Sequence, residues 1–270
     1  MDNVNVNLHL HKCQVQFYPP ERTLAIAKKT KTKSLEPQQA RSRESLQKLL
    51  RAATEVLGHH GVEGATIPRI AHHAGLTPGS VYRRFHDKEA LLEAAILGML
   101  DRQDQTSRSL TPEMAREIPL RVFADQIING FVVGYRVRAP LIRAMRRFVD
   151  GRPSSAFKKK ASRLEIQSFE RIVDLFMTHC DRIQHPNPRQ AVSTALMMVV
   201  STVHELVVRH TDLGRWKHLL PEDDQALKRE LVRAFLNYLG VEDAPGAAGK
   251  MEAGQMAAMK RWRERTSHNV

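Results

Sequence analysis

The hydrophobic residues between positions 46 and 103 recur every three or four residues, which is the spacing of amphipathic helices. The first run begins at Leu46, and Gly61 is a natural end for it. Thr66, a residue type that favours the N-cap position, precedes a second and shorter run. Asp87 stands in the same kind of position before the last run of this region. The pattern predicts a small helical domain over residues 41–103.

Beyond residue 103 the chain continues as long segments of helical periodicity separated by prolines. No segment alternates apolar and polar residues with a period of two, so the predicted fold class is all-α. We expect Pro140 to lie in the first turn of a helix rather than to interrupt one. The helices expected in a second domain, residues 104–240, span 117–137, 138–150, 154–180, 188–209 and 222–239.

Residues 66–86 have the form of two short helices joined by a tight turn at Gly75, as in a helix-turn-helix. Val81 and Phe85, four residues apart, would anchor the second helix to the domain core. Its other face would then present small hydrogen-bonding residues, starting at Thr77, to the outside. Such residues near the start of an exposed helix suit the major groove of DNA. A pair of packed helices with a merely solvated outer face has the same spacing, so the pattern alone leaves both interpretations open.

The charge balance makes an acidic partner plausible without deciding the fold. The 270 residues include 42 Lys and Arg against 29 Asp and Glu, a formal net charge of +13. Residues 41–103 hold nine basic and seven acidic residues, so any affinity for nucleic acid there must come from placement. Residues 138–163 hold nine basic residues and one acidic residue. That stretch could be a solvated helix face, contact an anionic ligand or lie along the flanks of DNA.

No signal for export or membrane insertion is found in the sequence. The longest unbroken apolar run, residues 195–200, is too short to cross a bilayer, and the first thirty residues lack the apolar core of a secretory signal. The two cysteines lack the paired spacing of a zinc site. We therefore expect a cytoplasmic protein without a membrane partner.

The sequence contains none of the common catalytic or cofactor motifs. His204 precedes His210 by six residues rather than four, which places the two rings on different faces of a helix. A phosphate loop, a dinucleotide fingerprint and a nucleophile elbow are all missing. We expect no enzymatic activity, no cofactor and no metal. A helical scaffold that binds other proteins is the alternative, and salt-sensitive binding to DNA would separate the two classes.

A series of motifs runs in a fixed order through residues 41–96. It comprises Leu49-Leu50-x-Ala52-Ala53, Gly61, Gly64, Thr66, Ile70-Ala71, Ala74-Gly75, Val81-Tyr82-x-x-Phe85 and Lys88-Glu89-x-Leu91. In this register the stretch resembles the DNA-binding domain of the TetR (tetracycline repressor) family, and residues 181–240 resemble the family's regulatory domain more weakly. The resemblance implies an N-terminal, homeodomain-like three-helix domain with a helix-turn-helix. A C-terminal helical domain for ligand binding and dimerisation would follow. The implied function is a sequence-specific transcriptional regulator, most often a repressor, whose affinity for its double-stranded DNA operator a small-molecule inducer controls.

The resemblance also implies which residues contact DNA. Thr66 and Tyr82 would bind phosphates, and Lys88 would do so where the helix dipole also favours an anion. Packing under the helix is the alternative for Tyr82, and solvation is the alternative for Arg69. The full expected set is Arg43, Thr66, Arg69, Thr77, Pro78, Gly79, Ser80, Tyr82, Arg83, Arg84, His86 and Lys88.

Two further residue sets concern the second domain. The resemblance implies a homodimer in which the helices at 188–209 and 222–239 of two chains form a four-helix bundle, although both apolar stripes could instead pack within one chain. The expected dimer-interface residues are Ala195, Val199, Val203, Leu231, Phe235 and Tyr238. Helices between residues 104 and 180 would enclose the inducer pocket, although each expected lining residue is also a plausible core residue. These residues are Phe123, Phe131, Tyr135, Met145, Phe148, Phe169, Phe176 and Met177.

The two ends of the chain lack a regular hydrophobic pattern. Residues 1–40 are polar and include a lysine-rich run at 28–33. We expect a disordered basic arm there, either dispensable, translated from an upstream start codon, or in contact with DNA. Residues 241–270 are expected to form a loose tail.

Overall fold

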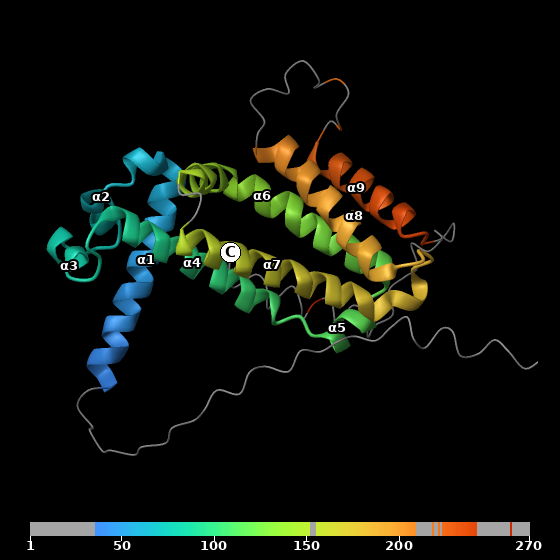
Figure 1. Ribbon diagram of the computed structural model, residues 1–270, viewed down its shortest axis with the longest axis horizontal. Helices are drawn as coiled ribbons and strands as arrows, with labels where there is room; N and C mark the ends of the chain where they lie inside the picture. Colours follow the sequence, from blue (N-terminus) through green and yellow to red (C-terminus); the bar gives the residue numbers. More distant parts are fainter. Residues whose placement is uncertain are drawn as a thin grey trace, which may run out of the picture.

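The computed structural model describes residues 36–151, 155–208, 218, 221, 223–241 and 260. All regular elements in these residues are helices, and no strand occurs among them, which confirms the all-α prediction. Figure 1 shows α1 to α4 gathered at one end of the molecule and the later helices extending from them. The elements are α1 (Glu36–Gly64), α2 (Ile67–His73), α3 (Pro78–Tyr82), α4 (Lys88–Ser107), α5 (Pro112–Glu117), α6 (Leu120–Asp150), α7 (Ala156–Phe176), the 3-10 helix η1 (Met177–Arg182), α8 (Pro188–Val203), the π-helical turn η2 (His204–Val208) and α9 (Asp224–Tyr238).

The turns and caps of the first four helices follow the residues that predicted them. Gly61 and Gly75 have positive φ angles of 68° and 66°. Gly61 kinks α1 three residues before its end, and Gly75 makes the turn after α2. The Thr77 hydroxyl accepts a hydrogen bond from the Ser80 backbone N–H at 3.3 Å, which caps α3. The Asp87 carboxylate caps α4 in the same way at 2.7 Å. Local sequence therefore determines where each of these helices begins or ends.

The prediction for the N-terminal arm was wrong in one part. Residues 36–40 are helical and continue into α1, whereas the sequence placed them in a disordered arm. Residues 1–35 lie outside the described residues, as does nearly all of the expected C-terminal tail. The predicted boundary between residues 103 and 104 falls inside α4, and the short α5 was not predicted at all.

The first hydrophobic core joins α1 to α4, but it also includes residues from the second domain. Its fully buried members from the first four helices include Leu49, Leu57, Ile70, Val81, Leu91 and Ile96. Ala144 and Phe148 of α6 and Phe157 and Ala161 of α7 complete the same cluster. The rings of Phe148 and Phe157 meet edge to face with centroids 5.8 Å apart. The corner between α6 and α7 is therefore part of the core of the end that carries α1 to α4.

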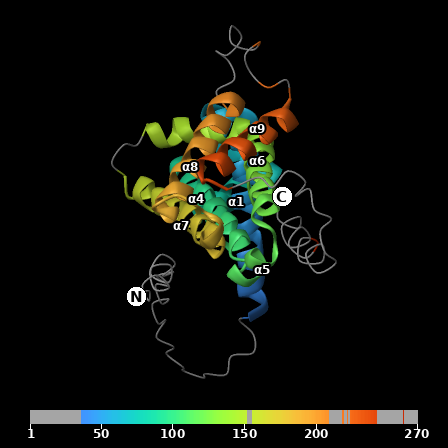
Figure 2. The same ribbon diagram turned by 90° about the vertical axis from the view of Figure 1, so that its right-hand side faces the viewer.

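α6 reaches both cores because it bends. The sequence predicted a new helix near Pro140, but α6 runs unbroken through this residue, which is a correction. A proline inside a helix removes one backbone hydrogen bond and bends the helix without ending it. Figure 2 shows the last part of α6 pointing away from the direction of its first part. Close to the bend, Gly58 packs against Leu141, and a Cβ at Gly58 would lie 3.3 Å from the Leu141 Cβ.

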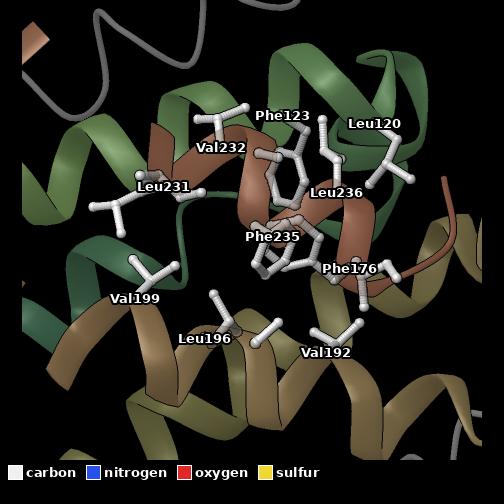
Figure 3. Close-up of a cluster of buried hydrophobic side chains, with 14 of the residues drawn as sticks. Leu120, Phe123, Phe176, Val192, Leu196, Val199, Leu231, Val232, Phe235 and Leu236 are labelled. Carbon is white, nitrogen blue, oxygen red and sulfur yellow. The ribbon is translucent and has the colours of Figure 1, made fainter. Parts of the chain in front are cut away.

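The second core fills the space between the first part of α6, the end of α7, α8 and α9. Three rings form its centre, with centroids 4.7 Å apart for Phe123 and Phe176 and 5.0 Å apart for Phe176 and Phe235. Figure 3 shows these rings surrounded by aliphatic side chains of α8 and α9. Since α8 and α9 pack on each other and on α6, their apolar stripes are used inside one chain.

This packing corrects most of the expected dimer interface. Ala195, Val199, Val203, Leu231 and Phe235 are all buried in the second core of a single chain, so they offer no surface to a partner. The alternative that these stripes pack within one chain holds for those five residues. Tyr238, the sixth, is 41% exposed.

The apolar character of α8 has the same explanation. By length and composition alone, Pro188–Val208 could cross a membrane, although its longest unbroken apolar run covers only residues 195–200. Core helices pass the same test, and α8 places Ala191, Leu196 and Val199 in the second core. We therefore read it as a core helix.

A buried ionic cluster ties α4 to α7. Asp104 of α4 is only 2% exposed, and its carboxylate pairs with Arg171 of α7 and with Arg108. Ser168 of α7 donates a further hydrogen bond to it at 3.3 Å. Burial alone would raise the pKa of Asp104, but the hydrogen bonds and charges of the two arginines outweigh it and lower the pKa. The carboxylate is therefore ionised and holds the end of α4 in place.

Replacing Asp104 with alanine is expected to lower the free energy of unfolding by about 3–5 kcal/mol, because it leaves the Arg171 guanidinium without its partner. Asp104→Asn keeps a hydrogen-bond acceptor and should cost less. Urea unfolding followed by circular dichroism measures both changes. Asp101→Ala, an exposed position one turn earlier, is the control and should stay within about 0.5 kcal/mol of the parent. Equal losses at both positions would contradict the assignment.

Candidate nucleic-acid interface

The short helix α3 is held by one side and exposed on the other. Val81 is 0% exposed in the first core, and Phe85 packs partly buried against the same cluster, as predicted. Thr77 and Gly79 are exposed at the start of the helix, and Tyr82 is 56% exposed at its end. The structure thus gives α3 an outward face with small residues first and a phenol last.

The hydroxyl groups at the start of α3 are partly used by the helix itself. The Thr77 hydroxyl accepts from the Ser80 N–H, and the Ser80 hydroxyl donates to the Thr77 carbonyl at 2.7 Å. The Thr77 hydroxyl keeps its own proton to donate, and the Ser80 oxygen keeps lone pairs to accept. Gly79 has nothing within 4 Å of the place where a Cβ would stand, so its surface is open. These groups could meet base edges without breaking the cap.

The expected phosphate-binding residues surround α3 but differ in how free they are. Thr66 is exposed and is the N-cap of α2 without a side-chain capping bond, so its hydroxyl is available. Arg69 donates to the Gly64 carbonyl at 2.7 Å, and Lys88 donates to the Val62 carbonyl at 3.3 Å. Both side chains retain further N–H donors, but part of their hydrogen bonding is already structural.

The segment after α3 adds three exposed basic or titratable side chains. Arg83 is the C-cap residue of α3, and Arg84 donates to the Ser45 hydroxyl on α1 at 3.3 Å. The His86 Nε2 atom lies 3.0 Å from the Asp87 carboxylate. Pro78, in the first turn of α3, is exposed as well.

Arg43 is the one expected DNA contact that lies apart from α3 and the segments around it. It is exposed on α1, four residues before Gln47, and therefore shares a helix face with Gln47. Arg102 of α4 donates to the Gln47 side chain at 3.4 Å. This face of α1 thus turns toward α4, away from Ser45 and the segment that follows α3.

The residues expected to line an inducer pocket fall into three groups. Phe123, Phe176 and Met177 are buried in the second core, and Phe148 is buried in the first core with Met145 packed against it. Phe131, Tyr135 and Phe169 are only partly buried. The structure thus does not bring all eight together. Two hollows of about 190 Å³ each lie where α1 meets α6, and none of the eight lines them.

The comparisons with known proteins agree with this geometry. The sequence profile of the bacterial regulatory proteins of the tetR family matches residues 49–95, from the middle of α1 into α4. The uncharacterized HTH-type transcriptional regulator TtgW of Pseudomonas putida is 36% identical over 78 residues, 29% of this chain and 56% of TtgW. The regulator SrpR of Pseudomonas putida is also 36% identical over 78 residues, and these cover 35% of SrpR. The matched region thus spans about half or less of these two relatives.

Longer matches extend over both domains. The HTH-type transcriptional regulator BetI of Cronobacter sakazakii is 27% identical over 189 residues, 70% of this chain and 89% of BetI. A TetR-family structure from Mesorhizobium loti superposes with a TM-score of 0.57 at 21% identity, over 74% of this chain and 98% of that one. Residues 49–95 thus form a domain of the tetR-family type. Members of the TetR family are transcriptional regulators rather than enzymes, and the fold of this chain is theirs in both domains.

Substitutions on α3 are expected to separate phosphate contacts from base contacts in this TetR-family domain. Tyr82→Phe, which removes only the hydroxyl, should weaken binding to all DNA sequences alike. Ser80→Ala should instead change the preference among operator variants, by about 1–3 kcal/mol at the affected base pair. Fluorescence anisotropy with an operator fragment and its single-base variants measures both effects. Uniform losses at both positions would contradict the base-reading role of Ser80.

Proposed function

We propose that the protein is a homodimeric, TetR-type transcriptional repressor that reads operator DNA with α3 and releases it when a small molecule binds the second domain. The observation that carries this proposal is the division of α3 into two faces. Val81 is fully buried, while Thr77, Gly79 and Tyr82 stay exposed. A helix held in this way can enter the major groove without unfolding any of its support.

A ligand site between α6, α7 and η2 is supported by a group of polar and aromatic side chains. Phe131 and Phe169 are partly buried there at the edge of the second core. Arg146 donates to His204 at 2.7 Å, and the rings of Tyr135 and His204 meet edge to face. Burial and the nearby carboxylate of Glu165 raise the pKa of Tyr135. Apolar walls with a few convergent polar groups are typical of small-molecule sites.

The shared core supports transmission from such a site to α3. Phe148 and Phe157 belong to α6 and α7, yet they pack in the core that also buries Val81. Asp104 fixes the end of α4 to α7. A shift of α6 or α7 would therefore move residues on which the orientation of α3 depends.

The experiment that tests the proposed function begins with DNA fragments selected from the protein's own genome for binding to it. Affinity for a selected fragment should fall steeply as salt rises, because bound phosphates release counterions. It should also exceed the affinity for unrelated DNA by a factor of about 10³ or more. Equal and weak binding to every fragment would overturn the proposal in favour of a helical protein-binding scaffold.

Most of the predicted dimer-interface residues are buried within one chain, so a dimer requires a different surface. α8 and α9 lie side by side in both views (Figures 1 and 2), and each of them carries large exposed side chains. Met197 is 52% exposed, Met198 47% and Tyr238 41%. Three exposed large residues on adjacent helices support this face as the contact between two copies in a four-helix bundle.

A carboxylate introduced by substitution on this face of α8 is expected to weaken the contact between the two chains. Met198→Glu should weaken dimerisation by at least about tenfold, since burying an unpaired charge costs more than about 1.4 kcal/mol. Analytical ultracentrifugation measures the change. The matched control is Ile166→Glu, an equally exposed apolar position on α7, 58% exposed, which should leave the dimer intact. Retention of the dimer by the Met198 variant would place the interface elsewhere.

A further inference from the structure

A hollow of about 190 Å³ lies where the last part of α6 meets the end of α1. Figure 1 shows these two helices side by side at the end of the molecule that carries α2 and α3. On the α1 side its wall consists of Gly58, Gly61 and Val62, so little side-chain bulk fills the space. Gly58 packs closely on Leu141, and Gly61 has a φ angle of 68°, so neither position takes a larger side chain without strain. The hollow is therefore built into the way the two helices meet.

α6 supplies the opposite wall, which has an apolar part and a charged part. Pro140 and the buried Ala144 form the apolar part, and Arg143 and Arg147, one helical turn apart, form the charged part. Arg143 donates to the Val208 carbonyl at 2.9 Å, which positions its guanidinium and leaves further N–H donors for a ligand. The exposed side chain of Arg147 makes no hydrogen bond or ion pair with another described residue.

Two acidic side chains stand near this hollow, but neither of them lines it. The Oε2 atom of Glu63 is 3.7 Å from the place where a Cβ of Gly61 would stand. Asp150 follows Arg147 by three residues on α6, and no ion pair between the two occurs in the structure. Lys88 adds a positive charge nearby, because its ammonium group donates to the Val62 carbonyl at 3.3 Å. The charges in the wall itself are thus both positive.

The size and the lining of the hollow together indicate a class of ligand. Sites for drug-sized molecules enclose about 300–1,000 Å³, whereas an apolar cavity of about 150 Å³ is enough for benzene. The space of about 190 Å³ therefore suits a molecule with one ring or a short chain. An arginine guanidinium binds a planar carboxylate through two parallel N–H···O bonds. A small organic acid offers both parts at the right scale.

We propose that this hollow binds a small organic carboxylate, whose apolar part packs against Pro140 and Ala144 and whose carboxylate pairs with Arg147 and Arg143. The inference goes beyond the proposed function, because neither Tyr135 nor any DNA contact takes part in the site. It also gives a role to part of the basic stretch at residues 138–163. Since the ligand touches α1 and α6 at once, it stabilises the arrangement of the two helices that forms the hollow.

Isothermal titration calorimetry of the full chain without DNA tests the site, with benzoate as the probe. Benzamide, which has nearly the same shape but no charge, should bind at least about tenfold more weakly than benzoate. Acetate, which has the charge but no ring, should also bind more weakly. Arg147→Ala should weaken benzoate binding by about tenfold or more, and Arg147→Lys should lose less because it keeps the charge. Equal affinities for benzoate and benzamide in the parent protein would overturn the inference without any variant.

Arg138→Ala is the matched control. Arg138 belongs to the same basic stretch of α6 but lines the neighbouring hollow together with Glu55, so its loss should leave benzoate binding unchanged. Equal losses for Arg138→Ala and Arg147→Ala would reduce the effect to general attraction by the stretch and overturn the site.

The same variants separate a carboxylate site from a contact with DNA. If Arg147 binds the DNA backbone instead, Arg147→Ala reduces the slope of log K against log salt by about 0.9 and leaves benzoate binding as it was, which would overturn the inference. Absence of benzoate binding by the parent protein would overturn it too, while the selected DNA fragments would still be bound. Benzoate binding by a protein that prefers no DNA fragment would overturn the proposed function alone.

Discussion

Burial of Val81 in the first core is the contact on which the candidate interface depends. α3 has only five residues, far fewer than a helix needs to be stable alone in water, so its position comes from what holds it. The Thr77 cap and the Gly75 turn set its start, and Val81 sets its rotation. The outward direction of Thr77, Gly79 and Tyr82 follows from that single inward side chain. A change in the packing around Val81 therefore reaches the exposed face of α3.

The first core is not formed by α1 to α4 alone. The bend of α6 at Pro140 carries Phe148 away from the second core and into the first, where it meets Phe157 of α7. Asp104 adds a buried ion pair, which tolerates little displacement because separated charges would be left desolvated. Packed interiors shift between discrete arrangements rather than deforming smoothly. A rearrangement of α6 and α7 is thus expected to move α3 as a unit.

The sequence predicted those features that depend on residues close together in the chain. The caps at Thr77 and Asp87, the turn at Gly75 and the burial of Val81 each depend on residues a few positions apart, and the structure confirms them. The expected dimer stripe at Ala195 and Val199 was wrong, because an apolar face does not say which helix covers it. The burial of Asp104 carried no signal, since Arg108 follows it by four residues but its other partner, Arg171 of α7, lies 67 residues away. Pro140 is compatible with a helix start or a bend, and only packing decides between them.

The same distinction applies to the exposed basic residues of α1. Residues 41–103 carry a formal excess of two positive charges, so the direction of each charge matters more than their sum. Arg41 and Arg43 carry the same charge and lie two residues apart. Helical periodicity alone does not say which side of α1 turns toward α3. The bonds from Arg84 to Ser45 and from Arg102 to Gln47 supply that direction from tertiary structure. Which basic side chain of α1 lies on the side of α3 is therefore a property of how α1 packs, and a sequence motif alone does not decide it.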